Sequence, residues 1–188
     1  MSLTPETVVR AAGELADAGE LTLAALAARL GVKVPSLYKH VGGLDDLQRR
    51  LALAAIDELA GTLAEATVGR SGRDALHACA TAYRAWARAH PGRYAALQRA
   101  PDPAETELHA AADRFTRLLL AMMRGYGLDE DATVHATRAV RSALHGFVSL
   151  ETAGGFGLPQ DVDTSYDRLV DLLDAGLSAG GAAGPVDA

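Results

Sequence analysis

The chain has 188 residues, of which 49% are hydrophobic and 22% are charged, and its formal net charge is −6. This length and composition suit one globular domain, or two small ones that share a core, and exclude global disorder. Aromatic residues make up only 5% of the chain, so Leu, Ala and Val must fill the interior, and that mixture favours packed helices over sheets. The expected fold class is all-α.

The negative charge is distributed unevenly along the sequence. Residues 1–50 hold six Lys or Arg against six Asp or Glu, whereas residues 51–188 hold twelve against eighteen. The interval from Thr22 to His40 has three cations and no acid, and it contains both lysines of the chain, Lys33 and Lys39. The overall charge therefore does not exclude a nucleic-acid partner for the first part of the chain.

Cysteine usage and hydropathy indicate the compartment. A single cysteine, Cys79, cannot form an intrachain disulfide, and no Cys-based zinc spacing is present. The first residues show no basic leader followed by an apolar run, and no run of about 18 uncharged apolar residues occurs. We therefore expect a cytoplasmic protein that does not contact a membrane.

Caps and glycines predict three short helices in the first 41 residues. Thr4-Pro5-Glu6 is typical of a helix start, and Gly19 supplies the left-handed residue that ends that helix. Thr22 caps a second helix that stops at Gly31, and a third is expected over residues 34–41. The second and third helices, joined by a tight turn, form a helix-turn-helix pattern.

Longer segments with helical apolar spacing follow. They are expected at about residues 44–67, 71–90, 91–99, 102–125, 129–152 and 163–178. No alternating strand pattern is visible, and the tail at 181–188 has too little apolar surface to be ordered. About nine helices are therefore expected, with an N-terminal domain over residues 1–60 and a helical domain over residues 61–180.

The third helix has the pattern of a helix that enters the major groove of DNA. Leu37 and Val41, four residues apart, would face the core together with Leu26 and Leu30. The side chains left outside are of the types that contact phosphates and base edges. They are Lys33, Ser36, Tyr38, Lys39 and His40. The alternative from pattern alone is a surface hairpin with an ordinary solvated face.

Two strings in this region resemble the N-terminal DNA-binding domain of the TetR family of transcriptional repressors. They run from Thr22 to Val32 (TLAALAARLGV) and from Pro35 to Val41 (PSLYKHV), and Leu44-Asp45-Asp46-Leu47 follows them. The resemblance covers about residues 5–60. It implies that the chain binds a palindromic double-stranded operator as a homodimer.

The resemblance also implies which residues contact DNA. Tyr38 and His40 would contact the phosphate backbone. Thr22, which belongs to the matched segment, would also contact DNA, and the groove would be lined by Lys33, Val34, Pro35, Ser36 and Lys39. The sequence departs from the family at Leu44, where many members have a lysine, so one phosphate contact is expected to be missing.

A second region, about residues 75–178, resembles the C-terminal ligand-sensing domain of one TetR subgroup that is named for its Trp, His and Gly residues. The matching residues are Trp86, His90-Pro91, Tyr94, His145-Gly146-Phe147 through Glu151, and Gly154-Gly155-Phe156-Gly157-Leu158-Pro159. This resemblance implies a homodimer through the last two helices, which pair as a four-helix bundle. Apolar side chains on those helices offer more surface than a small domain hides. They are Val140, Leu144, Phe147, Leu150, Leu169, Leu173 and Leu177.

A repressor that responds to a small molecule needs an apolar cavity with a few polar groups. The candidate lining residues are Tyr83, Trp86, Tyr94, Phe115, Leu119, Met122 and His145. For each of them the alternative is an ordinary core residue whose polar tip is satisfied internally. Arg138, Arg141 and His145 share a helical face, so either an anionic ligand or the nearby Glu151 would pair with that face.

Other classes of protein are less well supported. A phosphate loop, a nucleophile elbow and a His-Glu-x-x-His motif are all absent, so neither an enzyme nor a cofactor is expected. Asp131 with His135, and His109 with Asp113, are interpreted as surface ion pairs and not as metal ligands. The remaining alternative is a ligand-binding helical protein that has lost DNA binding. The expected function is a DNA-binding repressor that a small-molecule effector of unknown identity releases from DNA.

Overall fold

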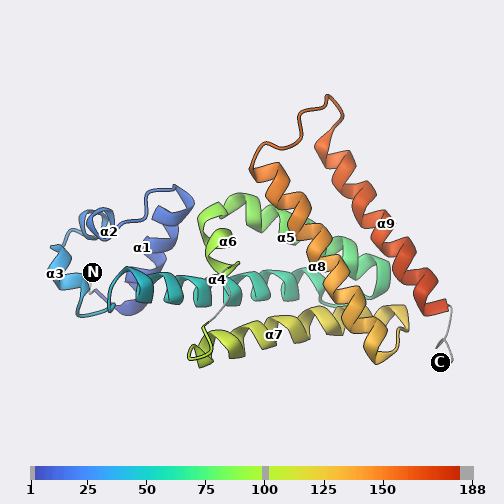
Figure 1. Cartoon of the computed structure of the whole chain (residues 1–188), viewed down its shortest axis with the longest axis horizontal. Coiled ribbons are helices and arrows are strands. Elements are labelled where there is room, and N and C mark those ends of the chain that lie inside the picture. The colour runs from blue at the N-terminus through green and yellow to red at the C-terminus, as the bar shows by residue number, and fades with distance from the viewer. Residues whose placement is uncertain (1–2, 99–101, 183–188) are drawn as a thin grey trace. The chain divides into compact units, whose positions relative to one another are not determined.

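The computed structural model describes residues 3–98 and 102–182. This part of the chain consists of nine α-helices and one short 3-10 helix and contains no strand (Figure 1). The prediction of an all-α fold is therefore confirmed. Contacts divide the chain into two compact units, one formed by residues 1–59 with 89–113 and the other by residues 60–88 with 114–188.

The first two helices begin and end close to where local sequence signals place them, and the third begins where it is expected. They are α1 (Pro5–Asp17), α2 (Leu23–Arg29) and α3 (Val34–Leu37). The hydroxyls of Thr4 and Thr22 each accept a backbone N–H from the first turn, at 3.3 and 3.0 Å. Gly19 and Gly31, which follow α1 and α2, have φ angles of 72° and 67° that other residues rarely adopt.

Helix α3 is shorter than the predicted span of residues 34–41. The N–H groups of His40 and Val41 both donate to the carbonyl of Leu37, at 2.8 and 3.0 Å. Two donors on one carbonyl tighten the last turn, so regular α-helix ends at Leu37 and a turn continues to His40. The exposed side chains of this turn nevertheless remain next to those of α3.

The remaining helices follow the predicted segments to within a few residues. They are α4 (Leu44–Thr67), α5 (Gly72–Ala89), α6 (Pro91–Leu97), α7 (Thr106–Met123), the 3-10 helix η1 (Arg124–Tyr126), α8 (Glu130–Thr152) and α9 (Val162–Ala182). The Asp129 carboxylate caps α8 by accepting the N–H of Ala132 at 2.7 Å. None of the helices in the described residues is both long enough and apolar enough to cross a membrane.

Helix α9 continues about one turn beyond its predicted end at residue 178. A Cβ atom at Gly181 would lie 1.9 Å from the carbonyl oxygen of Tyr126, so the glycine allows α9 to approach η1 closely. The predicted disordered tail at 181–188 is therefore wrong for its first two residues, which are helical. Its other residues, 183–188, lie outside the described part of the chain.

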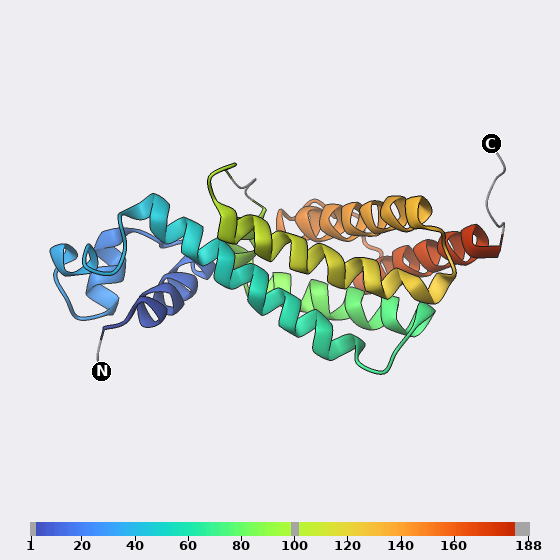
Figure 2. The same cartoon turned by 90° about the horizontal axis from the view of Figure 1, so that it is seen from below.

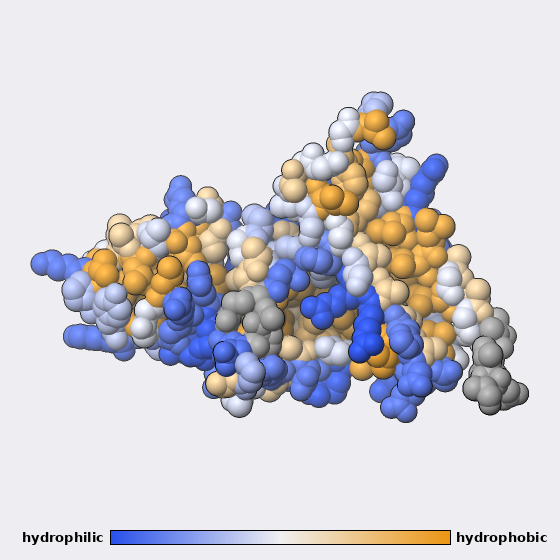
Figure 3. Space-filling model, in the orientation of Figure 1, coloured by the Kyte–Doolittle hydropathy of each residue, from blue (hydrophilic) through white to orange (hydrophobic). Residues whose placement is uncertain are grey.

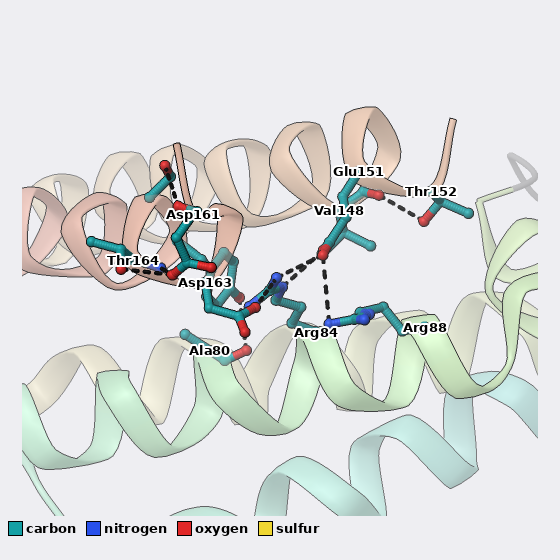
Figure 4. Close-up of polar contacts among 11 residues, drawn as sticks. Ala80, Arg84, Arg88, Val148, Glu151, Thr152, Asp161, Asp163 and Thr164 are labelled. Carbon is teal, nitrogen blue, oxygen red and sulfur yellow. Dashed lines mark hydrogen bonds and ion pairs between the residues drawn. The ribbon is translucent and has the colours of Figure 1, made fainter. Parts of the chain in front are cut away.

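In the second unit, α8 and α9 run side by side in opposite directions (Figure 2). Arg84 on α5 forms ion pairs with both helices. Its guanidinium donates to both carboxylate oxygens of Glu151, at 2.8 and 2.6 Å, and to Asp163 at 2.7 Å (Figure 4). It also lies over the ring of Tyr166, 4.8 Å from the centroid. The hydrogen bond to Arg84 lowers the pKa of Glu151, so the pair stays ionised at neutral pH.

Candidate DNA-binding and effector-binding sites

The inner face of the helix-turn-helix is buried as its spacing predicts. Leu26 and Leu37 are fully buried and Val41 is 2% exposed, whereas Leu30 is only half-buried. They pack with Val8 of α1 and Leu47 of α4 in the core of the first unit. Burying each of these five side chains (Val8, Leu26, Leu37, Val41 and Leu47) contributes roughly 1.5–3 kcal/mol, and their packing fixes the outer face of α3 relative to α1 and α4.

All eight predicted DNA-contacting side chains reach solvent. The exposed ones are Thr22, Lys33, Pro35, Tyr38 and Lys39, and the half-buried ones are Val34, Ser36 and His40. Tyr38 is 57% exposed although it follows the fully buried Leu37 directly. Within the described residues neither lysine forms an ion pair, so both ammonium groups remain available to phosphates. Their contact with DNA stays a prediction.

Asp46 on α4 holds the turn that follows α3. Its carboxylate accepts the N–H of Gly42 and the guanidinium Nε–H of Arg50, both at 2.9 Å, and it also pairs with Arg49. Burial alone would raise the pKa of this carboxyl, but the three hydrogen bonds outweigh burial and lower the pKa from 3.8 to about 2. The carboxylate is therefore ionised at any physiological pH.

We expect Asp46→Asn to lower the free energy of unfolding at pH 7 by about 1–2 kcal/mol, because hydrogen bonds to a charged acceptor are replaced by neutral ones. The folded-state pKa lies below the ordinary value, so the stabilisation is complete above pH 4 and is lost as the pH falls towards about 2. Urea denaturation between pH 2 and 7 measures this. Asp45→Asn is the control, since the exposed neighbour makes no such bonds. Equal losses in both variants at pH 7 would contradict the assignment.

Helix α6 ties the other elements of the first unit together. The backbone N–H and the guanidinium Nε–H of Arg93 donate to the carboxylate of Asp17 on α1, at 2.9 and 2.8 Å. The same guanidinium donates to Glu58 on α4 at 2.7 Å. Next to it, Gly92 packs directly on the backbone of α1, because a Cβ there would meet the carbonyl of Ala16 at 2.0 Å.

The second unit contains a narrow cavity between α4, α5, α7 and α8. The unoccupied space inside the cavity is enough for about one water molecule, so side chains must move before a larger molecule can enter. Its lining residues are Leu63, Cys79, Tyr83, Phe115, Leu119, Met122, Met123, Thr137, Val140, Arg141 and Leu144.

Four of the seven predicted ligand-binding residues line this cavity: Tyr83, Phe115, Leu119 and Met122. The other three do not. Trp86 is 5% exposed but is not part of the lining, and Tyr94 belongs to the first unit. His145 is half-buried, and its Nε2 lies 3.5 Å from the hydroxyl of Ser149. Trp86 and Tyr94 are buried away from this cavity, and their roles in ligand binding stay predictions.

The predicted dimerisation surface also needs correction. Val140, Leu144 and Leu177 are only 3–8% exposed within one chain, and the first two line the cavity, so they offer no surface to a second copy. Helical spacing groups apolar residues on one face of a helix, but it does not show which other helix of the same chain covers that face. Phe147, Leu169 and Leu173 are half-buried, and Leu150 is 53% exposed.

Hydrophobic side chains remain exposed over α8 and α9 (Figure 3). Leu150 near the end of α8 and Leu172 in the middle of α9 are 53% and 72% exposed. In the loop between the helices, Phe156 and Leu158 are 38% and 79% exposed. Exposed apolar groups of this size are candidates for an interaction surface.

The structure also tests the residue pairs considered as metal ligands. In residues 3–98 and 102–182, no group of three or more His, Cys, Asp or Glu is placed to hold a metal ion. Neither Asp131 with His135 nor His109 with Asp113 forms the ion pair that the spacing suggested. The ring of His109 contacts the carbonyl oxygen of Asp102 instead, at 3.2 Å.

A short helix that lies between two exposed lysines without ion pairs in the described residues, and that is braced from behind by a buried aliphatic cluster, is typical of a helix-turn-helix transcriptional regulator. Residues 76–173 match the family described as "Tetracyclin repressor-like, C-terminal domain". The chain is 38% identical over 181 residues to the HTH-type transcriptional regulator Rv0681 of Mycobacterium tuberculosis, covering 93% of this chain and 82% of that protein. It is 33% identical over 183 residues to the regulator YobS of Bacillus subtilis, covering 94% of each.

The fold is similar to that of TetR from Acinetobacter baumannii AYE, a single-residue variant of which was crystallised in complex with minocycline. For that variant the TM-score is 0.69 at 24% identity, covering 95% of this chain and 98% of that one. The chain belongs to the TetR family of transcriptional regulators. It is accordingly a regulator and not an enzyme.

Proposed function

We propose that the protein is a repressor that binds a palindromic operator as a homodimer and leaves it when a small-molecule effector binds the second unit. The exposed surface of α3 and its two ends carries the proposal. Lys33 at the start of α3 and Lys39 in the turn after it have no counter-ion among the described residues, while Leu37 anchors the opposite side. Tyr38 and His40 would contact phosphates, and Thr22, Val34, Pro35 and Ser36 would lie along the groove. DNA binding is thus assigned to residues 1–60, and effector binding and dimerisation to residues 61–180. Such a regulator acts in the cytoplasm.

The direct test is a mobility-shift titration with the DNA upstream of the protein's own gene. We expect specific binding with two protomers per site, and an affinity that falls steeply with salt because phosphate contacts release counterions. If the protein bound this DNA no better than scrambled DNA at about 50–150 mM salt, the result would favour the alternative, a ligand-binding helical protein that does not bind an operator.

The cavity in the second unit supports the effector part of the proposal. Its lining is mostly apolar, as in most small-molecule sites, and its walls would have to move to admit an effector. A protein with the same fold, the Acinetobacter TetR variant, holds minocycline. An effector that enters must favour a dimer whose recognition helices are no longer about 34–36 Å apart. To shift the ratio of the released state to the DNA-binding state from 1:99 to 99:1, the effector must bind the released state more tightly by roughly 5.5 kcal/mol.

The exposed apolar residues of α8 and α9 support dimerisation through these helices. We expect Leu172→Glu to raise the dissociation constant of the dimer at least about tenfold, because a charge would be buried in an apolar contact. Leu150→Glu should act in the same direction. Analytical ultracentrifugation measures the change, and Val68→Glu, at a residue that is 79% exposed between α4 and α5, is the control. A dimer equally stable in all three variants would place the interface elsewhere.

A further inference from the structure

The wall of the cavity carries only one formal charge. Most of its side chains are aliphatic, aromatic or methionine, and its polar groups are Arg141, the Thr137 hydroxyl, Tyr83 and the Cys79 thiol. The Thr137 hydroxyl donates to the carbonyl of Thr133 at 2.8 Å. Burial raises the pKa of Cys79 to about 12, so the thiol stays neutral. No acid is among the described residues that line the cavity, and its electrostatic character is that of one cation.

Arg141 also lacks a counter-ion within the described chain. Arg84 and Arg93 each pair with two carboxylates, whereas Arg141 forms no ion pair with any described residue. From the sequence, Glu151 was a possible partner of the helical face that carries Arg141, but both carboxylate oxygens of Glu151 accept hydrogen bonds from Arg84. Arg141 is an exposed residue that lines the cavity at its edge.

We infer that the effector is an amphipathic anion, with a compact apolar body in the cavity and a carboxylate or similar oxyanion paired with Arg141. The inference rests on the effector-binding role proposed above. A guanidinium offers a planar fork of donors that matches a carboxylate, and its pairing strengthens at the edge of an apolar site. The narrow cavity has flexible walls at Met122 and Met123, which can rearrange to admit an alkyl or aryl chain.

Three probes of equal length and different charge test the inference: octanoate, octan-1-ol and octylamine, titrated calorimetrically into the full chain. We expect octanoate to bind at least about tenfold more tightly than octan-1-ol, and octylamine to bind most weakly. Arg141→Gln should weaken octanoate binding about tenfold and leave octan-1-ol binding unchanged, while Arg141→Lys should retain part of the preference.

Arg138→Gln is the matched control. Arg138 lies one helical turn before Arg141, is likewise exposed, and does not line the cavity, so this variant removes the same charge outside the site. Equal effects of Arg138→Gln and Arg141→Gln would overturn the inference. So would octan-1-ol or octylamine binding as tightly as octanoate, or no binding by any of the three. The proposed function fails by a different result: an unliganded protein that does not bind DNA, or DNA affinity that is unchanged by a probe bound in the cavity.

Discussion

Replacing Lys33 and Lys39 together by Ala is expected to weaken operator binding on the order of 10²–10³-fold at about 0.1 M salt. The logarithm of the affinity falls with the logarithm of salt concentration by about 0.9 per phosphate contact, and a dimer that loses two contacts per subunit loses four. The salt slope should therefore become less steep by about 3.6. Fluorescence anisotropy with labelled operator DNA between about 50 and 300 mM salt measures both quantities.

The control for this variant removes two charges elsewhere. Arg70 and Arg124 are exposed and form no ion pair in the described part of the chain, and both lie in the second unit. The double variant Arg70→Ala, Arg124→Ala should keep the slope and change the affinity by less than about threefold, since screened distant charges contribute little. If the lysine variant behaved like this control, α3 would not be the DNA-contacting element.

The second large effect is expected at Gly92. An added Cβ would lie 2.0 Å from the carbonyl carbon and oxygen of Ala16 and 2.6 Å from the amide nitrogen of Asp17, all of them backbone atoms of α1. Backbone cannot rotate away as a side chain can, so α6 must separate from α1. Gly92→Ala should lower the free energy of unfolding by about 3 kcal/mol or more. It should also weaken DNA binding, since the separation disturbs the contacts of Arg93 with Asp17.

For Gly61→Ala, the same glycine-to-alanine change, we expect the free energy of unfolding to rise and not to fall. Gly61 lies inside α4, and nothing lies within 4 Å of the position of its Cβ. The substitution should raise stability by about 0.5–1 kcal/mol, because glycine is a poor helix former. Chemical denaturation of both variants decides the matter. Losses of similar size, or a stable Gly92→Ala protein, would show that α6 does not pack on α1 as described.

The features that the sequence predicted well depend on neighbours within a few residues. Thr4 and Thr22 cap helices through backbone groups three positions away, and Gly19 and Gly31 end helices through their own φ angles. The buried side of α3 follows likewise from the spacing of Leu37 and Val41. Local geometry determines each of these, so no knowledge of the tertiary fold was needed.

The features that the sequence did not reveal depend on partners far along the chain. Arg84 meets Glu151 across 67 residues, and the carboxylate of Asp17 meets Arg93 across 76. No local pattern distinguishes these arginines from others on amphipathic helices. The same limit explains Val140 and Leu144: periodicity groups side chains on one face, but the packing of α7 against α8 decides that this face lines a cavity.

A hydroxyl-radical footprint of the wild-type protein on its operator shows whether two copies of α3 enter the DNA. We expect two protected patches on one face of the duplex, centred about one helical turn or a whole multiple of a turn apart, each lost in the Lys33→Ala, Lys39→Ala variant. A single patch, or two patches that persist in that variant, would contradict the claim that two copies of α3 bind adjacent major grooves.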